Sequence, residues 1–239
     1  MNTRIHLSIT ALLLAVYWFF MFHIALYAPA DIATFIFIEG GTVESVSPYL
    51  WFALAALCLF GRLKMPTRLA TAAAAVLLGL REMDLHKSFF QEAAFRTHFL
   101  RSNFYLSDIV PLSHKIIGGL LVITLAVLVL YLLKTFVASW RQKDSPRLIH
   151  FYTLLAVALL AAAKVADRAN MYMEEYFHRP LEAHTNLIVQ AFEESAEMAA
   201  PVLLCTALIF YGFFRRPNNS AKQNKMLNII KKQNLKSKK

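Results

Sequence analysis

The stretch IIGGLLVITLAVLVLYLL, residues 116–133, decides the fold class of this chain. It contains no charged side chain over 18 residues. The hydrocarbon core of a bilayer is about 30 Å thick, and a helix needs about 20 mainly apolar residues to cross it. The stretch therefore predicts a transmembrane helix, and Gly118-Gly119 within it allows a neighbouring helix to approach closely.

The composition of the whole chain extends this prediction. Of its 239 residues, 58% are hydrophobic, whereas soluble domains have about 45–50%. We therefore expect an all-α, polytopic membrane protein without a separate soluble domain. Cys58 and Cys205 both lie in apolar runs, which argues against a disulfide framework and against a cysteine-based zinc site. The net charge of +10 is concentrated in short loops and in the tail, so we expect no nucleic-acid partner.

The apolar runs predict about six membrane spans within a membrane domain of residues 1–216. A basic, mostly disordered tail is expected at residues 217–239. The predicted spans are residues 7–27, 49–60 extended toward Glu44, 69–88, 116–133, 148–168 and 195–214. The first span is long for a signal peptide, and we interpret it as an uncleaved anchor.

The distribution of lysine and arginine predicts the orientation. With the N-terminus inside, the inner segments hold 17 of the 25 basic residues and only one acid, Asp144. The other 14 of the 15 acids fall on outer loops or outer helix ends. Because short cytoplasmic loops are enriched in lysine and arginine, both termini are expected in the cytoplasm. The short loops favour a bacterial plasma membrane.

The octet LREMDLHK, residues 80–87, is the leading candidate for a functional site. It follows an apolar run, residues 69–80, that is too short to cross a bilayer alone. A 20-residue span from Leu69 ends near Ser88, which would place Arg81, Glu82, Asp84 and His86 in its last two turns. Charged groups in a span cost about 2.5–3.5 kcal/mol each at the helix centre. These side chains must therefore face a polar cavity or one another.

Two other short spans also carry carboxylates at their outer ends. Glu44 extends the second span, and Glu193, Glu194 and Glu197 lie at the start of the sixth. Three short spans with acids on the same side predict a water-filled outer cavity lined by carboxylates.

Helical spacing places several of these side chains on shared faces. Glu82 and His86 are four residues apart, as are Glu193 and Glu197, while Arg81 and Asp84 are three apart. A further set at the end of the fifth span, comprising Lys164, Asp167 and Arg168, has the spacing of an ion-pair cluster along one helix face.

The strongest candidate residues are Glu82, His86 and Glu197, because an unpaired buried carboxylate is costly. They are expected to act as acid–base groups or as ligands of a divalent metal such as zinc, manganese or iron. A supporting set is expected around them, namely Glu44, Arg81, Asp84 and Glu194.

Three functions are compatible with this pattern. The first is a membrane enzyme, a metal-assisted hydrolase or transferase acting on a lipid or envelope intermediate. The second is a proton- or cation-coupled transporter, although the inner halves of the spans are almost wholly apolar. The third is a non-enzymatic scaffold or accessory subunit that docks a partner membrane protein. The expected partners are accordingly the lipid bilayer and a lipid substrate or a membrane protein.

Overall fold

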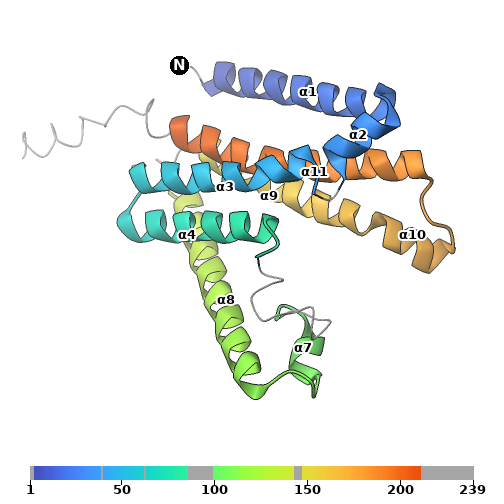
Figure 1. The fold of residues 1–239 in the computed structure, drawn as a ribbon. Helices are drawn as coiled ribbons and strands as arrows, with labels where there is room; N and C mark the ends of the chain where they lie inside the picture. The colour runs from blue at the N-terminus through green and yellow to red at the C-terminus, as the bar shows by residue number, and fades with distance from the viewer. Residues whose placement is uncertain (1–2, 39, 62, 86–98, 143–146, 211–239) are drawn as a thin grey trace, which may run out of the picture.

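A computed structural model describes residues 3–38, 40–61, 63–85, 99–142 and 147–210 of the chain (Figure 1). Every regular element among these residues is a helix, as the sequence predicts. The helices are α1 (Thr3–Tyr27), α2 (Ala30–Phe37), α3 (Thr42–Phe60), α4 (Met65–Glu82), α7 (Ser102–Leu106), α8 (Leu112–Trp140), α9 (Arg147–Asp167), α10 (Ala169–Phe177) and α11 (Ala183–Ile209). The predicted tail and His86 lie outside the described residues.

Four segments of the described chain are long and apolar enough to cross a membrane. They are Ile5–Tyr27, Ala30–Phe60, Leu112–Trp140 and Arg147–Asp167. The second of them contains α2 and α3. The membrane character expected from the sequence is therefore supported by helices of the required length. Neither α4 nor α11 is among the four. α4 carries charged side chains at both ends, and α11 carries Glu193, Glu194 and Glu197 near its middle.

The observed bounds of α4 correct the expected extension of this span to Ser88. The helix begins at Met65, with Pro66 in its first turn, and ends at Glu82. Proline is favoured at the start of a helix because its missing N–H is not needed there. Beyond Glu82 the backbone turns, and Asp84 adopts a left-handed conformation with φ of 54°. Arg81 and Glu82 thus lie in the last turn of α4, as expected, whereas Asp84 lies beyond its end.

The arrangement of the helices brings distant segments together. α3, α4, α9 and α11 lie side by side, α1 lies along α11, and α8 projects away from them (Figure 1). α3 and α11 run in one direction, while α4 and α9 run in the opposite direction (Figure 1). The C-terminal ends of α4 and α9 therefore meet the N-terminal halves of α3 and α11 at one end of the bundle.

The core between these four helices is apolar and contains many small residues. Its buried members are Trp51, Leu54, Ala55, Cys58, Ala72, Ala75, Leu148, Tyr152, Ala156, Ala200, Leu203 and Ala207. Small side chains let helix backbones approach closely, which is the usual way that helices associate within a membrane. Gly79 of α4 likewise packs against the ring of Phe52 on α3. These close contacts determine which helix ends meet.

A hydrogen-bonded group joins α1 to α9 at the opposite end of the bundle. The hydroxyl of Tyr152, which is 1% exposed, donates to Thr10 Oγ1 at 2.7 Å and lies 2.8 Å from His6 Nδ1. We expect Tyr152→Phe to lower the free energy of unfolding in detergent by about 1–2 kcal/mol, because His6 and Thr10 lose a buried partner. The exposed Tyr172 provides the control Tyr172→Phe, and equal losses for the two variants would contradict this role.

Candidate functional site: an acidic cluster at one end of the bundle

Glu82 occupies the end of α4 and is nearly buried. Its side chain is 6% exposed, and its Oε1 lies 3.4 Å from Nη1 of Arg81. The Arg81 side chain is 38% exposed, so its cationic group retains contact with solvent. The structure pairs Arg81 with Glu82, its neighbour in the chain. Adjacent residues within a helix do not face each other. Arg81 and Glu82 are the last two residues of α4, so this restriction is relaxed for them.

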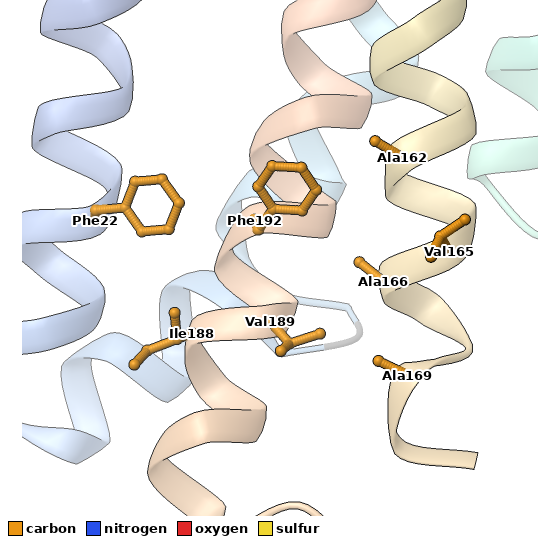
Figure 2. Close-up of a pocket in the computed structure, with 8 residues that line it drawn as sticks. All are labelled: Phe22, Ala162, Val165, Ala166, Ala169, Ile188, Val189 and Phe192. Atoms are coloured by element: carbon orange, nitrogen blue, oxygen red, sulfur yellow. The ribbon is translucent and has the colours of Figure 1, made fainter. Parts of the chain in front are cut away.

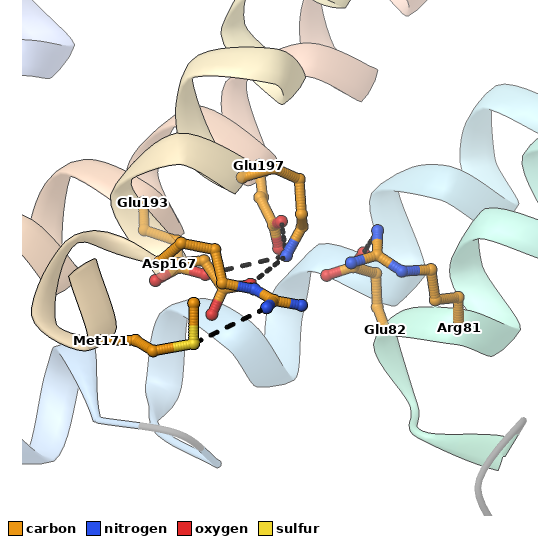
Figure 3. Close-up of polar contacts among 8 residues, drawn as sticks. Arg81, Glu82, Asp167, Met171, Glu193 and Glu197 are labelled. Carbon is orange, nitrogen blue, oxygen red and sulfur yellow. Dashed lines mark hydrogen bonds and ion pairs between the residues drawn. The ribbon is translucent and has the colours of Figure 1, made fainter. Parts of the chain in front are cut away.

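Lys164 of α9 reaches across to α11. Its Nζ lies 3.1 Å from Oε1 of Glu197 and 3.8 Å from Oε1 of Glu193, and 3.3 Å from Oδ2 of Asp167 on its own helix (Figure 3). The expected pairing of Lys164 with Asp167 is therefore confirmed. Arg168 also lies 3.9 Å from Asp167. The contacts of Lys164 with α11 are a finding of the structure, because sequence spacing relates only residues on the same helix.

Glu197 is the most buried carboxylate on α11, with a side chain that is 8% exposed. Its carboxyl group is near enough to that of Glu82 for the two to interact electrostatically. Figure 3 shows the Glu82 carboxyl directed toward the side on which Glu197 lies. The structure thus brings together two of the three leading candidates, Glu82 and Glu197, from segments more than one hundred residues apart.

The supporting carboxylates complete the cluster from α3 and α11. Glu194 interacts electrostatically with Glu44, Glu82 and Glu197. Glu44, in the first turn of α3, also accepts a hydrogen bond from the backbone N–H of Gly40, which has φ of +80°. Glu44 and Glu194 thus lie near each other, and the water-filled cavity that the sequence predicts around them remains a prediction.

The charges in this cluster do not balance. Around it the described residues contribute six acids (Glu44, Glu82, Asp167, Glu193, Glu194 and Glu197) and three bases (Arg81, Lys164 and Arg168). Buried like charges repel strongly in a medium of low dielectric constant. This excess of acids favours protonation of some of the carboxyl groups.

The metal hypothesis depends on a residue whose position is outside the described chain. Within the described segments, no group of three or more His, Cys, Asp or Glu side chains is arranged to hold a metal ion. The third ligand expected from the sequence is His86, which the structure does not describe. Zinc, manganese or iron binding by Glu82, His86 and Glu197 thus remains a prediction.

We expect the Lys164 contact to be important for stability. Lys164→Met would leave the buried Glu197 carboxylate without its nearest cation, lowering the free energy of unfolding by about 2 kcal/mol. This is less than for a fully buried pair because Lys164 is 44% exposed. Adding Glu197→Gln should restore most of the loss in a detergent unfolding assay. A double variant as unstable as Lys164→Met alone would rule out the ion pair as the cause.

No protein-family model, curated protein or solved structure matches the chain. The function of the site is therefore inferred from its geometry.

Proposed function

We propose that this protein is a six-span membrane enzyme whose Glu82–Glu197 pair performs acid–base chemistry on a lipid or envelope intermediate. The four apolar segments supply four of the spans. The other two spans are α4, whose 18 residues extend about 27 Å, and the 27-residue α11. The proposal places both termini in the cytoplasm of a bacterial plasma membrane, which the distribution of basic residues supports.

The observation that carries this proposal is the electrostatic interaction of two nearly buried carboxyl groups, Glu82 and Glu197, from different helices. General acid–base catalysis needs one group that donates a proton and one that accepts it. Neighbouring carboxyl groups that cannot both ionise supply such a pair. Lys164 holds Glu197 in place at 3.1 Å, and Arg81 does the same for Glu82 at 3.4 Å. Hydrolysis or group transfer at a polar lipid headgroup is the class of reaction that suits this arrangement.

The interior of the bundle favours chemistry at one face over transport across the membrane. Away from the cluster, the core along α3 and α11 consists of Trp51, Leu54, Ala55, Cys58, Ala200, Leu203 and Ala207. A conduction path for protons or cations is normally lined by polar groups. Residues 51–58 of α3 and 200–207 of α11 include two thiols, Cys58 and Cys205, and no carboxylate, amine or imidazole.

The proposal can be tested with the full chain reconstituted into vesicles. One set would contain phosphatidylethanolamine and phosphatidylglycerol, and a second would contain a polar lipid extract of bacterial membranes. Lipid composition would be followed over time by mass spectrometry. Time-dependent conversion of a lipid class supports the proposal. Unchanged lipids in both sets, with folded protein, would overturn it.

The same vesicles distinguish the other assignments of the site. A pH-sensitive dye inside them reports proton flux, and flux without lipid conversion would indicate transport instead. Metal content is measured on the same chelator-free preparations. Near-stoichiometric zinc, manganese or iron that is lost in His86→Ala would assign metal assistance to the reaction. Metal-free protein that converts lipid would assign the chemistry to the side chains alone.

A further inference from the structure

Two serine hydroxyls inside the bundle have no hydrogen-bond partner among the described residues. Ser47 of α3 is 1% exposed and Ser195 of α11 is 0% exposed. Other hydroxyls on these two helices, such as those of Ser45 and Thr206, donate to the carbonyl four residues earlier in their own helix. Ser47 and Ser195 do not, so their hydroxyl groups are available to a partner that the helix itself does not supply.

The two serines occupy equivalent positions on neighbouring helices. Val43 of α3 and Ala191 of α11 belong to one buried cluster. Ser47 and Ser195 each follow four residues later, on the same faces of their helices. Because α3 and α11 run in the same direction (Figure 1), the two serines lie at the same height, one turn further along the bundle.

Neither serine faces α4 or α9. Phe52, whose ring packs on α4, lies about 140° around α3 from Ser47. Glu197, which contacts α9, lies about 160° around α11 from Ser195. Figure 2 shows the apolar surface pocket beside α11, and Ser195 is not among the residues that line it. Both side chains therefore belong to the side on which α3 and α11 pack together.

A third polar group at this height is the backbone carbonyl of Glu44. Pro48 lies within α3 and has no N–H, so the carbonyl of Glu44, four residues earlier, lacks its usual helical donor. A serine side chain in a helix lies near the carbonyls three and four residues before it, which for Ser47 include that of Glu44. Within membrane helices, carbonyls that a proline leaves without a donor are satisfied by ordered water or by neighbouring polar side chains.

We propose that an ordered water molecule binds between α3 and α11, where it donates to the Glu44 carbonyl and exchanges hydrogen bonds with the hydroxyls of Ser47 and Ser195. Buried waters typically make about three hydrogen bonds to polar groups that have no other partner. Each serine follows a carboxylate of the acidic cluster in its own helix, Glu44 in α3 and Glu194 in α11. The water therefore joins the two helices beside that cluster, and its binding does not depend on the proposed enzymatic activity.

Radiolytic footprinting of the full chain in detergent micelles tests this site. X-rays convert a bound water into a hydroxyl radical in place, and the radical oxidises the nearest reactive side chain. Trp51 is the reporter, because it lies one turn after Ser47 on the same face of α3 and is itself 2% exposed. We expect oxidation of Trp51 in the wild type. It should fall by about tenfold in Ser47→Ala and in Ser195→Ala, since each variant removes one hydrogen bond to the water.

Ser45→Ala provides the matched control. Ser45 lies on the same helix, but its hydroxyl already donates to the Gly41 carbonyl at 2.7 Å, so its loss should leave the oxidation of Trp51 unchanged. Trp140, which is 55% exposed, is oxidised by bulk water in every variant and reports the radical dose. Trp51 that stays unoxidised in the folded wild type, or that is oxidised equally in all variants, would overturn the bound water.

A double-mutant cycle of unfolding in detergent supplies a second test. A water held by both serines predicts that either alanine variant raises the unfolding equilibrium constant by about tenfold and that the double variant is no worse than either. A buried hydroxyl without any partner is destabilising, so its replacement by alanine would then leave stability equal or higher, which would overturn the site. Coupled losses without oxidation of Trp51 would also overturn it, and would assign a direct bond between the two hydroxyls. Neither test uses lipid conversion, so failure of the water site and failure of the proposed enzyme are distinguishable.

Discussion

Glu197→Gln is expected to reduce lipid conversion by about 100-fold or more, which is the lower range for loss of a general acid–base group. Glutamine keeps the size of the side chain and its capacity to hydrogen-bond, but it neither gives up nor accepts a proton at neutral pH. The partner variant Glu82→Gln should have a similar effect, because the two carboxyl groups work as a pair. The combined variant should be little worse than either single one, since residues that act as a unit are not additive.

The control for this prediction is an acid outside the cluster. Glu175 on α10 is exposed, so Glu175→Gln removes one negative charge from the same end of the molecule without touching the cluster. We expect it to retain near wild-type conversion. Thermal unfolding of each variant shows whether the protein remains folded. Wild-type conversion by folded Glu82→Gln and Glu197→Gln would exclude the pair from catalysis.

Trp51→Ala is expected to produce the largest loss of stability, about 3–5 kcal/mol in the free energy of unfolding. Trp51 is 2% exposed and belongs to the core formed by α3, α4, α9 and α11. Removing the indole leaves a cavity that helix backbones cannot close without disturbing their contacts with one another. Unfolding in mixed micelles, followed by circular dichroism, measures this loss.

Two further substitutions test the cause of that loss. Phe60 lies on the same helix and is 90% exposed, so Phe60→Ala removes a large aromatic ring without opening a cavity. Its expected effect is within about 0.5 kcal/mol. Trp51→Phe should recover part of the loss, since the indole Nε1 has no hydrogen-bond partner among the described residues and only volume is removed. Similar losses for Trp51→Ala and Phe60→Ala would contradict the assigned core.

The membrane character of the chain and the members of the acidic cluster were predictable from the sequence. Glu44, Glu82, Glu194 and Glu197 each adjoin an apolar run too short to span a bilayer, and that pattern alone indicated that they belong together. The helix bounds were less predictable. α4 gains its length at its N-terminal side, from Met65, and α11 begins at Ala183 rather than near Ser195. An apolar run predicts which residues lie in the hydrocarbon layer. The ends of the helix depend instead on turns and capping residues, which an apolar run does not reveal.

The tertiary structure alone decided which of these groups meet. Helical periodicity identifies the residues on one face of a helix, but it does not identify the helix that this face contacts. The pairing of Lys164 with Glu197 follows from the close packing of α9 on α11, and the interaction of Glu82 with Glu197 follows from the packing of α3 against both α4 and α11. The apolar surface pocket lined by Phe22 of α1, Ala162 of α9 and Phe192 of α11 has the same origin, because helices distant in the chain form it. The composition of the chain indicates a membrane environment, and the packing of the helices brings the residues of the acidic cluster together.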